Sequence, residues 1–309
     1  MRVLATLAVA LALTACSPDA PAGSASSGPL PPGPPGDDIW LATLAETPDR
    51  LPTVGTPANV TERPGYDNQP YFLPDGSGFW YTANDDHAGQ ADIWRYDIAS
   101  AGVARVTQSA PESEYSATPL PDGSGISVIR VEADGIQRLW RFDLDGQNAS
   151  VLLADLAPVG YHKWSDDHTL VMFVLGEAGV SPSTLRVWNE TEGLLPVVAR
   201  DVGRSIQPIP GSGDVSYVQR HEDGSASIMR LHPGTGESEE MIRTLDGGDF
   251  HAWTPGGVIL MGQGSTLMAW RPGSDVEWKQ VADFSDIGFT ISRLAVSPDG
   301  VHIAFVAAF

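Results

Sequence analysis

The chain has 309 residues, with 18 basic and 39 acidic side chains and a formal net charge of −21. An acidic surface of this size repels phosphate backbones and anionic headgroups, which argues against nucleic acid and against direct electrostatic membrane binding. It suits a cationic partner, or simply keeps an exported protein in solution. The single cysteine, Cys16, leaves no partner for a disulfide and no second thiolate for a metal site.

Residues 1–15 have the form of a lipoprotein signal peptide. Arg2 precedes the apolar run Val3–Leu13, which is too short for a mature transmembrane helix. The run ends in Leu13-Thr14-Ala15-Cys16, which resembles the bacterial lipobox. We therefore expect lipidation at Cys16 and a periplasmic protein held to a bacterial membrane by its acyl chains, with the outer membrane favoured by Ser17. The alternative is an ordinary export signal that contains a cysteine.

Residues 16–37 are predicted to be a tether. The stretch after Cys16 contains seven prolines and four glycines and very few apolar side chains. Such a composition cannot bury enough surface to fold, so we expect an extended linker between the anchor and residues 38–309.

Residues 38–309 carry a sixfold repeat. The hexapeptide LPDGSG occupies Leu73–Gly78 and recurs letter for letter at Leu120–Gly125. Related turn signals continue at nearly constant spacing at Asp166-Asp167-His168, Pro210-Gly211-Ser212, Pro255-Gly256-Gly257 and Pro298-Asp299-Gly300. The segments between them are β-branched, aromatic or alternating, without a helical period. Four strands in about 40–50 residues predict one propeller blade, so the chain is predicted to be an all-β, six-bladed β-propeller with four-stranded blades.

The expected blades follow the turns. They lie near residues 68–107, 115–153, 160–199, 204–244 and 249–283, and the last combines 290–309 with 38–62. Residues 290–309 hold only two strands, and the missing pair lies at the start of the propeller. We therefore expect the N- and C-terminal strands to complete one blade together and so close the ring. Trp40, Trp94 and Trp140 recur in the third strands and are predicted to pack between blades.

Three features of the repeat resemble the PD40 (WD40-like) repeat of TolB-like six-bladed propellers. They are the Pro-Asp-Gly turn, the segment Asp92–Asp97 with its counterpart Arg138–Asp143, and the Val-Thr pair that follows. The resemblance covers nearly all of 38–309 and is weakest at Pro210. It implies a periplasmic binding protein of the cell envelope, without a counterpart here of the smaller α/β domain that precedes the propeller in that family.

The first residues of the innermost strands should surround one mouth of the central channel. Reading back from each turn gives Asn68, Tyr115, Tyr161, His162, Arg204, Asp249, His251 and Arg293, accompanied by Gln69, Ser116, Ser205 and Ser292. Polar, aromatic and ionisable groups that converge on one concavity indicate a ligand site. The alternative is that they only solvate a water-filled channel.

Acidic loops on the same side offer weak metal candidates. Asp85, Asp86 and His87, with Glu132 and Asp134 of the next blade, could supply ligands to a hard divalent cation. No EF-hand spacing is present, and we expect no cofactor. A nucleophile elbow is also absent from the sequence, so no catalytic residue is predicted. The expected function is therefore non-enzymatic binding of a protein or peptide of the envelope at the channel mouth. The alternative is a periplasmic hydrolase or lactonase with a divalent metal there.

The lipobox generates a direct prediction. Replacing Cys16 with serine removes the only thiol that can be acylated, so Cys16→Ser should move the protein from the membrane fraction to the soluble periplasmic fraction. Fractionation followed by immunoblotting measures this, with the unaltered chain as control. Undiminished retention in the membrane fraction would refute lipidation at this residue.

Overall fold

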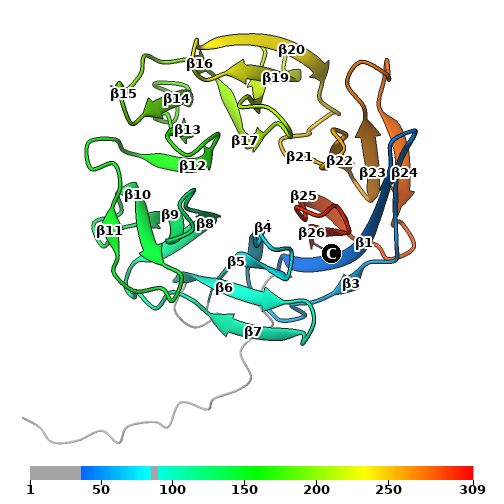
Figure 1. Ribbon diagram of the computed structural model, residues 1–309, viewed down its shortest axis with the longest axis horizontal. Helices are drawn as coiled ribbons and strands as arrows, with labels where there is room; N and C mark the ends of the chain where they lie inside the picture. The colour runs from blue at the N-terminus through cyan, green and yellow to red at the C-terminus, as the bar shows by residue number, and fades with distance from the viewer. Residues whose placement is uncertain (1–35, 85–89, 309) are drawn as a thin grey trace, which may run out of the picture. The chain divides into compact units, whose positions relative to one another are not determined.

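The computed structural model describes residues 36–84 and 90–308. Within these ranges the regular elements are strands, and they form six antiparallel sheets arranged in a ring (Figure 1). The described residues contain no helix long and apolar enough to cross a membrane. The prediction of an all-β, six-bladed propeller is confirmed.

Five blades are built from consecutive strands, each running from the channel outward. The first contains β4 (Asp67–Phe72), β5 (Gly78–Asn84), β6 (Ala91–Asp97) and β7 (Gly102–Arg105). The second contains β8 (Ser113–Pro119), β9 (Gly125–Val131), β10 (Gln137–Asp143) and β11 (Ser150–Val151). The third contains β12 (Val159–Trp164), β13 (Thr169–Val174), β14 (Thr184–Asn189), β15 (Gly193–Leu194) and β16 (Ala199–Arg200). The fourth contains β17 (Val202–Pro208), β18 (Val215–Arg220), β19 (Ala226–His232) and β20 (Glu237–Arg243). The fifth contains β21 (His251–Trp253), β22 (Ile259–Gln263), β23 (Thr266–Trp270) and β24 (Lys279–Asp283).

The sixth blade joins the two ends of the propeller, as predicted. Its order is β25 (Thr290–Val296), β26 (His302–Ala308), β1 (Asp38–Thr47) and β2 (Arg50–Val54), with the short β3 (Ala58–Asn59) also paired to β1. Strand β1 pairs with β26 in antiparallel register from Asp38 opposite Ala307 to Thr43 opposite His302. Because β1 and β26 pair with each other, neither is left as an unpaired edge strand.

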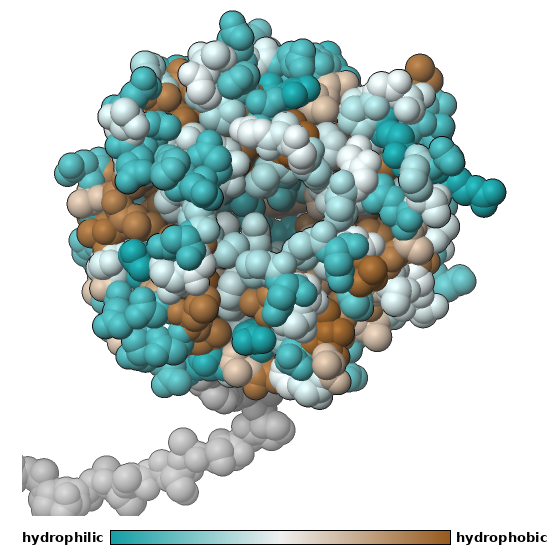
Figure 2. All heavy atoms as spheres, viewed as in Figure 1, coloured by the Kyte–Doolittle hydropathy of each residue, from teal (hydrophilic) through white to brown (hydrophobic). Residues whose placement is uncertain are grey.

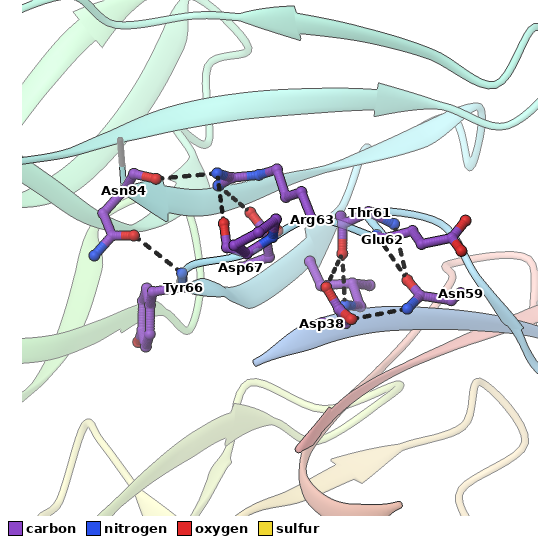
Figure 3. Close-up of polar contacts among 10 residues, drawn as sticks. Asp38, Asn59, Thr61, Glu62, Arg63, Tyr66, Asp67 and Asn84 are labelled. Carbon is purple, nitrogen blue, oxygen red and sulfur yellow. Dashed lines mark hydrogen bonds and ion pairs between the residues drawn. The ribbon is translucent and has the colours of Figure 1, made fainter. Parts of the chain in front are cut away.

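Side-chain contacts hold the start of β1 to β3 and the segment after it, and hold that segment to the first blade (Figure 3). Asp38 accepts hydrogen bonds from Asn59 Nδ2 at 2.8 Å and from Thr61 Oγ1 at 3.3 Å. Farther along, Arg63 forms an ion pair of 2.5 Å with Asp67 and also donates to the carbonyl of Asn84. Burial raises the pKa of Asp67 to about 6 although Arg63 opposes the shift. These bonds tie the segment after β3 to β4 and β5.

The repeated hexapeptide joins the innermost strand of a blade to the second strand. In both copies the leucine amide donates to the carbonyl of the last glycine, and the middle glycine amide donates to the leucine carbonyl. Asp75 accepts from the amide and the hydroxyl of Ser77, and Asp122 does the same with Ser124. The turn therefore satisfies its own polar groups, which explains why the same residues serve two blades.

Both glycines of the hexapeptide are required by its geometry. Gly76 has a φ of 72°, a left-handed conformation that strains most other residues. A Cβ added to Gly78 would lie 2.0 Å from the carbonyl oxygen of Tyr96 on the neighbouring strand. The sequence of the turn is thus dictated by one backbone angle and one close approach.

The hydrophobic core consists of clusters between neighbouring blades. One cluster places Ile39 and Val306 of the sixth blade against Phe79 and Tyr81 of the first. Another joins Phe305 of the sixth blade to Leu260 of the fifth. Trp40 and Trp94 each pack against one of these two clusters, and Trp140 packs against a third, between the first and second blades, which confirms their predicted place between blades.

The closing strand should carry a large share of the stability of the ring. Phe305 is fully buried in β26, so Phe305→Ala should lower the free energy of unfolding by about 3–5 kcal/mol through lost burial and a cavity. The control, Val301→Ala, alters a residue that is 45% exposed and should change little. Urea denaturation measures both. Equal, small effects would show that the closing blade does not hold the ring together.

Candidate functional site

The centre of the ring holds a small cavity with a volume of about 70 Å³. Figure 2 shows the molecule hollowed at this point, with hydrophilic residues around the opening. Each of the six innermost strands, or the segment leading into it, contributes to the lining. The residues that matter for the chemistry are Gln69, Ser116, Tyr161, Lys163, Arg204, Phe250 and Arg293.

Irregularities in the innermost strands position several of these side chains. The pairing register shifts next to the channel between Asn68 and Tyr71 in β4, and between Tyr115 and Thr118 in β8. Similar shifts occur in β12, β17 and β25, the last between Ile291 and Arg293. A bulge turns a side chain away from the regular alternation of a strand, and bulges are common beside functional sites. Here they surround the channel.

The two bulges of the first and second blades are joined by side chains. Gln69 and Ser116 have φ values of 59° and 56°, in the left-handed region. Ser116 Oγ donates to Gln69 Oε1 at 2.8 Å, and the amide of Ser116 donates to Thr82 Oγ1 at 3.3 Å. The uncommon backbone conformation is thus held by neighbours in both blades.

Arg293 is fixed by aromatic groups of two other blades. Its Cζ lies 3.9 Å from the ring centroid of Phe250 and 5.2 Å from that of Tyr161. Its Nη2 donates to the Tyr161 hydroxyl at 2.7 Å. Stacking of this kind holds a guanidinium in place and leaves its other N–H groups for a ligand.

Lys163 is a second cation of the channel. Its Nζ lies 4.0 Å above the ring of Tyr71, and among the described residues it has no ion pair and no hydrogen bond. Burial, with the nearby charge of Arg293, lowers the pKa of Lys163 to about 7. Only one other lysine, Lys279, exists in the chain.

Arg204 is the third cation of the cavity lining, and it forms an ion pair with an acidic residue. Its Nε lies 3.6 Å from Asp249 Oδ2, while Arg220 donates to Asp249 Oδ1 at 3.2 Å. Asp249 itself lies outside the cavity lining. The lining therefore contains Lys163, Arg204 and Arg293, and no carboxylate among the residues that the structure describes.

His162 and His251 each form a contact between neighbouring blades. His162 Nε2 lies 2.7 Å from Ser127 Oγ of the preceding blade, and Trp164 Nε1 donates to the same oxygen at 3.0 Å. The fifth blade repeats the arrangement, with His251 Nε2 at 2.7 Å from Ser216 Oγ. There Trp253 Nε1 donates to the serine oxygen at 2.8 Å. Burial lowers the pKa of each histidine to about 3, so both rings are neutral at pH 7.

Four of the expected channel residues, Asn68, Tyr115, Asp249 and Ser292, do not line the cavity. Asn68 is buried and donates to Asp37 Oδ2 at 2.7 Å. Tyr115 is half-buried and packs against the apolar cluster between the second and third blades. The expected residues that do line the cavity are Tyr161, His162, Arg204, His251 and Arg293, together with Gln69, Ser116 and Ser205.

The two acidic metal candidates that the structure describes, Glu132 and Asp134, are both engaged by neighbouring groups of their own blade. Glu132 forms an ion pair of 2.6 Å with Arg138 and accepts from Trp140 Nε1 at 3.0 Å. Asp134 accepts from the amide of Ile136 within its turn. The described part of the chain brings no three histidine, cysteine or acidic side chains together as a metal site. Asp85, Asp86, His87 and Cys16 lie outside the described residues.

Sequence reasoning missed Lys163 and Phe250. Both stand inside short apolar runs, where they look like ordinary strand residues. A signal for Lys163 was nevertheless present, because a chain with two lysines places one of them two positions after Tyr161, on the same face of β12.

The serine contacts predict equal roles for two distant residues. Ser127→Ala and Ser216→Ala each leave a buried tryptophan N–H and a histidine without a partner, so each should cost about 1–3 kcal/mol of unfolding free energy. The effects should add in the double variant, since the sites lie in different blades. Ser274→Ala, at an exposed residue, is the control. Unfolding curves equal to that of the control would contradict the assignment.

The histidine pKa values predict a dependence of stability on pH. Because the pKa of His162 falls from 6.5 to about 3 on folding, only the unfolded chain gains this proton between those values. The stability advantage of the unaltered chain over His162→Gln should therefore shrink by roughly 1 kcal/mol per pH unit below pH 6.5 and stay constant above about pH 7. Urea denaturation at several pH values measures this difference. A difference that does not change with pH would show that His162 is not buried in its neutral form.

Known proteins resemble this chain in part. No protein-family model matches it. An uncharacterized protein of Agrobacterium fabrum is 29% identical over 105 residues, which are 32% of this chain and 35% of that protein. A lasso peptide isopeptidase of Asticcacaulis excentricus is 28% identical over 129 residues, which are 40% of this chain and 18% of the isopeptidase. The matched region thus spans about a third or less of each relative.

Solved structures share the fold more broadly. A TolB candidate from Agrobacterium tumefaciens superposes with a TM-score of 0.63 and 14% identity, covering 88% of this chain and 99% of that one. TolB from Acinetobacter baumannii gives 0.56 and 13%, covering 87% and 63%. An oligogalacturonate lyase in complex with manganese gives 0.56 and 15%, covering 82% and 80%. At the level of fold, the resemblance to TolB-like six-bladed propellers is confirmed.

Proposed function

We propose that this protein is a lipid-anchored, non-enzymatic propeller of the bacterial periplasm that binds a protein or peptide partner of the envelope at its channel mouth. One observation carries the proposal: Tyr161, Arg204, Phe250 and Arg293 converge on one opening from four different blades. Aromatic residues and arginine are the types that dominate binding energy at protein interfaces. The lipobox, the export signal and the TolB-like fold support the location, with the outer membrane favoured.

The chemistry of the same opening favours binding over catalysis. Burial lowers the pKa of His162 and of His251 to about 3, so each ring is a weak base, and the Nε2 atom of each is taken up by a serine hydroxyl. No serine or threonine of the described channel is paired with a base and an orienting acid. What remains is a rigid ring that presents cations and aromatic faces.

A partner at the mouth can be detected by position-specific crosslinking in cells. A photoreactive amino acid at position 204, whose arginine side chain is 52% exposed, should give a discrete crosslinked product. The same amino acid at position 276, where Val276 is 96% exposed in the loop between β23 and β24, is the control and should give none. The product should disappear when Arg293→Gln is added. Equal products at both positions, or none at either, would contradict partner binding at the mouth.

A periplasmic hydrolase or lactonase with a divalent metal is the second candidate, favoured by the fold shared with the manganese-bound lyase. The donors of the described residues do not fit such an ion, because the cavity lining is cationic and no three histidine, cysteine or acidic side chains come together there. We therefore propose no resident metal. Elemental analysis of the purified chain tests this, and one tightly held manganese, calcium or zinc ion per chain would support the enzyme instead.

A further inference from the structure

We propose that the channel cavity is a binding site for a single carboxylate group of a peptide, held between Lys163 and Arg293. The inference rests on the proposed function and states the chemistry of the group that the partner would insert. Three independent features of the cavity carry it: its charge, the absence of internal counter-ions, and its size.

The local charge is opposite to that of the whole protein. The chain carries a formal net charge of −21, yet three basic side chains and no carboxylate line the cavity within the described residues. Two carboxylates that contact residues of the inner strands are engaged elsewhere, since Asp37 accepts from Asn68 and Asp249 is shared by Arg204 and Arg220. An acidic surface with a cationic centre attracts an anionic group to one place only.

Two of the three cations have no ionic partner in the described structure. Arg293 is held by Phe250 and Tyr161, and Lys163 stands over Tyr71. Like charges that face one cavity without a counter-ion destabilise the folded chain, and such an arrangement is common at ligand sites. An oxyanion between them would receive charge-assisted hydrogen bonds from both sides.

The size of the cavity limits what can enter. A volume of about 70 Å³ accommodates a carboxylate with a few water molecules, because one water occupies at least about 10–15 Å³ on this scale. A folded domain is too large to enter. The rings of Tyr161 and Phe250 at the opening provide apolar contact for the chain that carries the carboxylate.

The lysine content of the chain makes the site directly observable. With lysine labelled by ¹³C, the full chain in detergent has two lysine side chains to follow by NMR, Lys163 in the cavity and Lys279 as internal control. Lys279 lies on the outer strand β24 and forms an ion pair of 2.5 Å with Asp275. It does not line the cavity.

The probes are acetyl-trialanine with a free carboxyl terminus, its C-terminal amide, and acetyl-Ala-Glu-Ala amide. Both carboxylate peptides should shift the Lys163 signal in a saturable way, while the neutral amide leaves it unchanged and Lys279 responds to none. Arg293→Gln should weaken the carboxylate peptides at least tenfold, whereas the matched exposed variant Arg95→Gln should not. Lys163→Met should retain the fold and abolish the protection of the chain against heating by the carboxylate peptides.

Binding should also weaken more than fivefold from pH 6 to pH 9. Burial lowers the pKa of Lys163 to about 7 and the pKa of His162 and His251 to about 3, and it raises the pKa of Tyr71 to about 12, so Lys163 is the one of these four groups that changes charge between pH 6 and pH 9. An equal response to the neutral amide, or an unmoved Lys163 signal, would overturn the site. Inorganic phosphate that binds more tightly than either peptide would overturn the peptide as its occupant. Because the NMR experiment needs no cellular partner, its outcome is independent of the crosslinking result.

Discussion

The pairing of β1 with β26 is the constraint on which the rest of the structure depends. Every other blade is local in sequence, but this one joins residues 38–43 to residues 302–307 and so fixes the circumference of the ring. The cavity lies where the inner strands meet, and its residues come from blades that are distant along the chain. Arg293 reaches Tyr161 only because closure brings the sixth blade into the circle.

The residues near the channel have two roles, since some pack between blades and others line the cavity. Serine, histidine and tryptophan side chains hold the second blade to the third, and the fourth to the fifth, by the same set of contacts. The bulged positions beside them are thereby free to present other side chains to the channel. The binding surface is thus made from departures from regular pairing, supported by regular packing between blades.

The architecture was predictable from the sequence because its turns have strict requirements. Asp75 accepts a hydrogen bond within the turn, Gly76 adopts a positive φ, and Gly78 lies too close to the neighbouring strand for a side chain. These requirements make the same residues recur at the blade spacing. The cavity was less predictable. One bulge changes the face to which a strand residue points, and period-2 alternation cannot detect it. Lys163 lies after the bulge of β12, on the same face as Tyr161, and only the apolar character of its neighbours disguised it. The partners of His162 and Asp249 lie in other strands, out of reach of any local pattern.

The account rests on a reversal of charge between the surface and the channel. A crystal structure of the chain with a saturating concentration of acetyl-trialanine tests it most directly. The account predicts density for the terminal carboxylate within hydrogen-bonding distance of Lys163 Nζ and the Arg293 guanidinium, with the peptide leaving the cavity past Tyr161 and Phe250. A cavity that holds only water while the peptide carboxylate binds elsewhere would contradict it.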